Sequence, residues 1–165
     1  MRNGSYNESD KTEMKLTFAG FEGTEQEKAL SSPHEILAWS FGGFYGIDGD
    51  KKSPSSYLQS LSLTHYVTDA SPIFLKCLVS NRVFKSVVLE SSNKSQLVKL
   101  VLHDAIITGV STGGSGGESR LTENIVIAYK SVENLFEDRT KDDSKMVSSG
   151  RLDNSDMFPV NNRRY

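Results

Sequence analysis

Three features of the sequence indicate a mainly β fold, a β-barrel of two packed sheets with one flanking α-helix. Several segments alternate apolar and polar side chains with a period of two, which is the spacing of strands. Only one segment carries the signals of a helix. Polar, glycine-containing connections separate the alternating segments, as in antiparallel hairpins. Consecutive strands with a single helix are typical of all-β barrels and sandwiches.

The strands are expected at residues 14–21, 34–42, 58–67, 82–90, 95–111 and 122–133. In the third of these segments Leu61 and Leu63 alternate with Ser62 and Thr64, so one face is apolar and the other small and weakly polar. Residues 43–57 form a connection that is long and rich in glycine, serine and charge. A loop of that length in a compact domain is usually functional or disordered.

The helix is predicted to begin near residue 71. Ser71 can cap it, Pro72 suits the first helical position, and Asn81 can adopt the left-handed conformation that ends a helix. Between them an apolar stripe at helical spacing consists of Ile73, Phe74, Cys77 and Leu78. Cys77 is therefore expected to be a buried, inert thiol.

The domain organisation follows from where this patterning begins and ends. Residues 1–13 are predicted to be a flexible lead, because they are polar and carry no apolar run. Residues 14–136 form the barrel domain. Residues 137–165 have scattered apolar side chains without a period, which indicates a loosely attached tail, with Met157, Phe158 and Tyr165 as candidate anchors.

Composition excludes several classes of function. The 165 residues suit one domain, and 19 Lys plus Arg against 21 Asp plus Glu give a net charge of −2. This balance provides no general attraction to nucleic acid or to an anionic membrane. Apolar runs are far shorter than the ~20 residues of a membrane span. A single cysteine cannot form an intramolecular disulfide, so the core alone must hold the fold.

No motif supports catalysis, a cofactor or a metal. The glycine run at residues 113–117 lies between two predicted strands and precedes Glu118, which favours a hairpin loop over a phosphate-binding loop. His34, His65 and His103 have no second metal-ligating residue at a suitable spacing, so structural or surface roles are favoured. Trp39 is expected in the core. The sequence therefore predicts a protein that is not an enzyme.

Three blocks of the sequence resemble the hemolysin-coregulated protein (Hcp) family, the tube subunit of bacterial type VI secretion systems. The blocks are HEILAWSFG (34–42), LSLTHYVTDASPIFLKCLVSN (61–81) and VSTGGSGGESRLTENIVIAYKSV (110–132). The last is the most distinctive, because a glycine-rich hairpin precedes Leu-Thr-Glu and an alternating strand. Two features depart from the family pattern. Asn134, Leu135 and Phe136 stand where an aromatic residue is usual, and the tail contains no tryptophan.

The resemblance implies a structural function. Family members form hexameric rings that stack into a tube inside a contractile sheath, and the ring lumen carries effector proteins. Ser40, Ser60, Ser62 and Thr64 would then face the lumen, although on an isolated monomer they would face bulk solvent. The long connection would contact the adjacent ring through Ile47, Asp48, Asp50, Lys51 and Lys52.

The implied partners are further copies of the chain, effector proteins, and the sheath, spike and baseplate of the apparatus. The implied location is the bacterial cytoplasm before firing. The subunit then passes to the medium or to a target cell without a signal peptide, consistent with the polar N-terminal residues. Two alternatives stay open at this point. One is a tail-tube protein of another phage-like contractile particle, and the other is a monomeric β-barrel that binds a small ligand or sugar.

Overall fold

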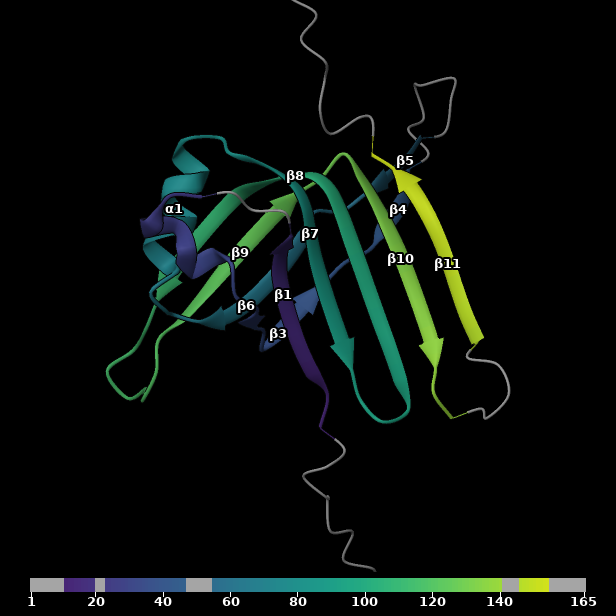
Figure 1. Cartoon of the computed structure of the whole chain (residues 1–165), viewed down its shortest axis with the longest axis horizontal. Coiled ribbons are helices and arrows are strands. Elements are labelled where there is room, and N and C mark those ends of the chain that lie inside the picture. The colour runs from purple at the N-terminus through teal and green to yellow at the C-terminus, as the bar shows by residue number, and fades with distance from the viewer. Residues whose placement is uncertain (1–10, 20–22, 47–54, 141–145, 155–165) are drawn as a thin grey trace, which may run out of the picture.

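A computed structural model describes residues 11–19, 23–46, 55–140 and 146–154 (Figure 1). In chain order its elements are β1 (Glu13–Ala19), the 3-10 helix η2 (Glu25–Leu30), β2 (His34–Glu35), β3 (Ala38–Ser40), β4 (Gly43–Gly46), β5 (Ser55–Leu58), β6 (Leu61–Tyr66), α1 (Ser71–Val79), β7 (Val83–Ser92), β8 (Gln96–Gly113), β9 (Thr122–Ala128), β10 (Ser131–Asp138) and β11 (Met146–Asp153). The prediction of a mainly β fold with one α-helix is confirmed.

The strands form two antiparallel sheets. In the larger, nine-stranded sheet the order is β2-β1-β7-β8-β9-β6-β3, and β10 and β11 extend it from β8. Strands β4 and β5 form a separate two-stranded sheet. Figure 1 shows β1, β7, β8, β10 and β11 running side by side, with β9 and β6 crossing behind them. The 18-residue strand β8 belongs to both groups, because its first half pairs with β10 and its second half with β9.

The large sheet is not a closed barrel, so that part of the prediction is wrong. Among the described residues the ladder stays open at β2 and β3. The predicted strand 34–42 breaks between β2 and β3. Alternation placed Ile36 and Trp39 on opposite faces of that strand, yet Ile36 is 3% exposed and Trp39 also packs against the core. The Ile36 amide donates to the Met14 carbonyl, and the Leu37 amide donates to the Thr64 carbonyl. One bent segment thus spans from β1 to β6 without completing a ladder.

Strand β8 bends at the point where its pairing partner changes from β10 to β9. Asp104 has φ 48°, which is a left-handed conformation. This conformation costs energy for every residue except glycine, and among the other residues Asp and Asn tolerate it best. Residues before it pair with β10, and Ile106 onward pair with β9. The predicted single strand 122–133 is divided at the same place into β9 and β10. The bend therefore lets one continuous strand cross from one side of the core to the other.

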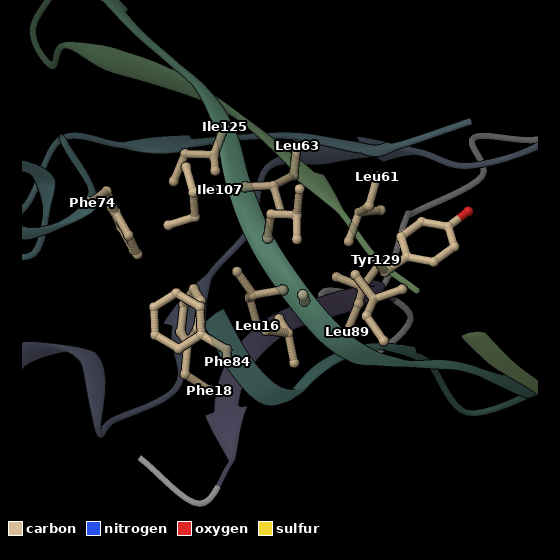
Figure 2. Packing of buried hydrophobic residues seen from close by; sticks show 14 of the residues in the cluster. Leu16, Phe18, Leu61, Leu63, Phe74, Phe84, Leu89, Ile107, Ile125 and Tyr129 are labelled. Carbon is tan, nitrogen blue, oxygen red and sulfur yellow. The ribbon is translucent and has the colours of Figure 1, made fainter. Parts of the chain in front are cut away.

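The core lies between these groups of strands. Figure 2 shows aromatic side chains Phe18, Phe74 and Phe84 at one end and Tyr129 at the other, with aliphatic side chains between them. Phe74 comes from α1 and is fully buried, so the helix covers the aromatic end. Each apolar side chain removed from water in this way contributes about 1.5–3 kcal/mol. Burial of alternate residues in each strand fixes which face points outward.

Helix α1 begins at Ser71 and follows the predicted stripe, with Phe74 and Cys77 buried. The predicted cap differs: Ser71 is already helical, and its hydroxyl accepts a hydrogen bond from the Thr68 amide at 3.1 Å. Asn81 has φ 51°, so the expected left-handed end of the helix is confirmed. Of the described helices, none combines the length and the apolar character needed to cross a membrane.

Two regions contain more structure than the sequence indicated. Residues 146–153 of the predicted tail form β11, which pairs with β10 along its whole length. Asn154, at its end, is 6% exposed, and its amide donates to the Lys130 carbonyl at 2.7 Å. The predicted long connection at residues 43–57 contains β4 and β5. Met157, Phe158 and Tyr165 lie outside the described residues.

Candidate functional site

A run of small, uncharged residues covers the outer side of β3, β6 and β9, and we call it the small-residue face. Its members are Ala38, Ser40, Ser62, Thr64, Asn124 and Val126. These residues alternate with Leu61, Leu63, Ile125 and Ile127, which point into the core. The small-residue face therefore results directly from the period of two along adjacent strands.

Strand register brings the predicted residues of this face together. Ser40 pairs directly with Ser62, and Ala38 pairs with Thr64. The Thr64 hydroxyl donates to Asn124 Oδ1 at 2.6 Å, which ties β6 to β9 on the outer side of the sheet. A shallow hollow of about 390 Å³ lies over the six residues. Its polar groups are hydroxyls and one amide, which can both donate and accept hydrogen bonds.

Ser60 occupies a different position from the other three predicted residues. It precedes β6 and borders a neighbouring hollow of about 560 Å³ that Ser40 and Ser62 also line. Phe44 and Tyr57 also line this hollow. The structure therefore places all four predicted residues along one continuous surface, with Ser60 at its border with the β4–β5 sheet.

Aromatic side chains are exposed on the β4–β5 sheet. Phe44 and Tyr57 are cross-strand partners with ring centroids 5.3 Å apart, and Phe44 and Tyr45 are 57% and 61% exposed. Exposed aromatic clusters of this kind favour contact with another surface. The chain between β4 and β5 includes Ile47, Asp48, Asp50, Lys51 and Lys52, which all lie outside the described residues.

Sequence reasoning missed Asn124 and Val126. The signal was present, since Glu123 and Ile125 alternate with them along β9, but register was needed to place β9 beside β6. The same register extends the face to β8, where Gly109 pairs with Val126 and Ser111 with Asn124. An added Cβ at Gly109 would lie 3.3 Å from the Val126 side chain, so glycine, which has no Cβ, fits best at this position.

The described part of the chain holds no group of three or more His, Cys, Asp or Glu residues that could bind a metal. His34 and His65 are buried, whereas the His103 side chain is 28% exposed. Burial raises the pKa of the Cys77 thiol, which keeps it protonated and unreactive near neutral pH. The chemistry available on the small-residue face is therefore reversible hydrogen bonding and contact.

Comparison with known proteins shows the family to which the chain is similar. The family model described as "Type VI secretion system effector, Hcp" matches residues 15–135. Protein hcp1 of Pseudomonas aeruginosa is 27% identical over 142 residues, which cover 81% of this chain and 88% of that protein.

Solved structures share the fold. The crystal structure of Hcp1 from Salmonella typhimurium has a TM-score of 0.64 at 19% identity, covering 88% of this chain and 96% of that one. A type VI secretion system effector from Yersinia pestis has a TM-score of 0.61 at 22% identity, covering 85% and 98%.

The family match defines the class of protein, which is a structural protein of a secretion apparatus and not an enzyme. The chain belongs to the Hcp family of type VI secretion proteins. Members of this family are tube proteins that assemble into rings and tubes, and the type VI system secretes them.

Proposed function

We propose that the chain is a subunit of the type VI secretion inner tube, in which six copies close into a ring and rings stack. The lumen of each ring carries effector proteins. Membership of the Hcp family supports the tube role. The observation that carries the lumen assignment is the small-residue face, an uncharged surface backed directly by the core.

The small-residue face suits a channel wall for varied cargo. Its side chains are short, so they leave space, and their hydroxyl and amide groups adapt to partners of either hydrogen-bonding sense. With no charge among its six residues, the wall neither attracts nor repels cargo by net charge. Ser40, Ser62 and Thr64 would contact effectors directly, and Ser60 would do so at the border near the β4–β5 sheet.

The β4–β5 hairpin is the proposed contact between stacked rings. Phe44 and Tyr57 stand at its exposed base, and Ile47 would supply an apolar anchor beyond them. Asp48, Asp50, Lys51 and Lys52 would pair with opposite charges across the junction. Exposed ion pairs contribute only about 0–1 kcal/mol each, so the affinity must come from repetition around the ring.

The further partners follow from the tube role. A tube subunit would contact the contractile sheath on its outside and the spike and baseplate at its ends. It would reside in the bacterial cytoplasm until contraction, and then reach the medium or a target cell as a folded protein.

Native mass spectrometry and electron microscopy of the purified chain test the ring. Hexamers and annular particles are expected at high concentration. A stable 18.2 kDa monomer under all salt and protein concentrations would contradict the type VI secretion tube and also the alternative of a tail-tube protein from another contractile particle. It would favour a monomeric ligand-binding protein.

A substitution in the small-residue face tests the cargo role. Ser40→Gln places a longer side chain on this exposed face, so rings should persist while retention of a small effector in a pull-down falls. Ser95→Gln, in the exposed turn between β7 and β8, is the matched control and should retain the effector. Equal retention by both variants would remove Ser40 from the lumen.

A further inference from the structure

His34 on β2 is buried in an apolar setting without a hydrogen-bond partner at one nitrogen. It is 9% exposed, and no described group pairs with its Nε2 atom, which is itself shielded from solvent. Its ring packs edge-on against Phe18 of β1 and Phe74 of α1, with centroids 5.9 and 5.3 Å away. A neutral imidazole fits this position, whereas an imidazolium would leave a buried N–H without an acceptor.

A second buried histidine lies on the same phenylalanine. The ring of His65 packs edge-on against Phe74 at 5.5 Å. In contrast to His34, it has a carboxylate partner, because its Nε2 lies 2.9 Å from Glu123 Oε1. The other carboxylate oxygen of Glu123 accepts a hydrogen bond from the Thr112 hydroxyl at 2.7 Å. Among the described residues, the buried carboxylate that lies beside these rings, that of Glu123, is thus already engaged by His65 and Thr112.

The remaining groups around His34 offer little to stabilise a positive charge. From β6 it faces His65, from the turn before α1 it faces Asp69, and η2 presents the Leu30 carbonyl. A pocket of about 180 Å³ beside both histidines is also lined by Glu35 and Arg120. Arg120 stacks over the Tyr66 ring at 3.7 Å, so a cation already stands at the pocket. Asp69 is exposed, and water screens its attraction.

We propose that His34, Phe74 and His65 form an acid-sensitive latch, in which His34 holds the bent segment between β1 and β6 in place near neutral pH and releases it when protonated. His34 can hold this segment because of its position in the chain. Its backbone pairs with Leu16 of β1, and two residues later the chain crosses to β6. Expulsion of the imidazolium from the core would free β2, the bent segment that runs from β2 to β6, and η2, whose Leu30 carbonyl faces His34.

The direction of the effect follows from linkage. Burial lowers the pKa of His34 below its ordinary value of 6.5, with the neighbouring His65 adding to the lowering. The opened state therefore takes up a proton as the pH falls below about 6.5, while the closed state resists it. Closure is fully favoured above that pH and weakens progressively in acid.

Hydrogen exchange followed by mass spectrometry on the full chain tests the latch without any substitution. Protection factors for residues 25–40, corrected for the intrinsic pH dependence of exchange, should fall between pH 7.5 and pH 5.0. The protection factors are expected to drop about three- to thirtyfold. The upper limit applies if the His34 side chain has its ordinary pKa of 6.5 in the opened state and stays neutral in the closed state. Protection in β7 and β8 should change much less. Equal protection of residues 25–40 at the two pH values would overturn the proposal.

Two substitutions assign the effect to His34. His34→Phe keeps a ring against Phe18 and Phe74 but cannot titrate, so protection of residues 25–40 should become independent of pH over this range. His103→Gln, which removes the partly exposed third histidine, should retain the wild-type response. A response that persists in His34→Phe or disappears in His103→Gln would assign the pH dependence elsewhere. If His34→Phe does not fold, the exchange of the unsubstituted chain still decides.

Discussion

His65 Nε2 lies 2.9 Å from Glu123 Oε1, and each side chain is only 2% exposed. The two residues are direct partners on β6 and β9, and their chain neighbours Thr64 and Asn124 form the corresponding hydrogen bond on the opposite face of the sheet. One pair of adjacent strands is thus held by a polar contact on each side. The buried contact fixes the register that gives the small-residue face its composition.

Removing the carboxylate of Glu123 should be destabilising. Glu123→Ala leaves the His65 imidazole and the Thr112 hydroxyl without their buried partner, so the free energy of unfolding in urea should fall by about 1–3 kcal/mol, the cost of a buried hydrogen-bonding group left unsatisfied. Glu123→Gln retains the shape and an amide that can both donate and accept, and should lose clearly less. Glu118→Ala, in the exposed hairpin loop, should stay within about 0.5 kcal/mol of wild type. Similar losses for the alanine and glutamine variants would show that the carboxylate itself, and not the shape that glutamine retains, dominates at residue 123.

The end of α1 allows a test of backbone strain. Asn81 has φ 51°, and the amides of Asn81 and Arg82 donate to the carbonyls of Leu78 and Cys77 to close the helix. Asn81→Ala should lower the free energy of unfolding by about 1 kcal/mol, because a Cβ without a compensating polar group is disfavoured in this conformation. Asn81→Gly should be neutral or stabilising. Thermal unfolding of the two variants checks the order, and a more stable alanine variant would contradict it.

The sequence was sufficient for what depends on local pattern. Alternation located most strands, and the apolar stripe of Phe74 and Cys77 identified the buried side of α1. Alternation also placed Ser62 and Thr64 opposite the core residues Leu61 and Leu63. These features need only the period of a strand or a helix, which the order of side chains carries directly.

What the sequence did not reveal depends on contacts between distant segments. Asn124 joins the small-residue face only because β9 pairs with β6 in one particular register. Strand β11 has weak apolar patterning of its own and is held by backbone pairing with β10. The break at Ile36 arises because one short segment must serve both β1 and β6. None of these pairings can be read from the local alternation of side chains.

Tyr129 provides a prediction at alkaline pH. Its hydroxyl donates to the Gln59 carbonyl at 2.6 Å at the far end of the core (Figure 2), and burial raises its pKa from the ordinary 10 to about 12. The unfolded chain therefore loses this proton at lower pH than the folded chain. The stabilisation that results is complete below pH 10 and is lost as the pH rises from about 10 to about 12.

Tyr129→Phe separates the two contributions of that hydroxyl. At pH 7 the variant should lose about 1 kcal/mol of unfolding free energy, the usual net value of one hydrogen bond. Between pH 9.5 and 11.5, its urea unfolding free energy should decline less steeply than that of the wild type. Tyr45→Phe, at a position 61% exposed, is the control and should follow the wild-type slope. A Tyr129→Phe variant that declines as steeply as the wild type would mean that the buried phenol is not the group whose ionisation weakens the fold.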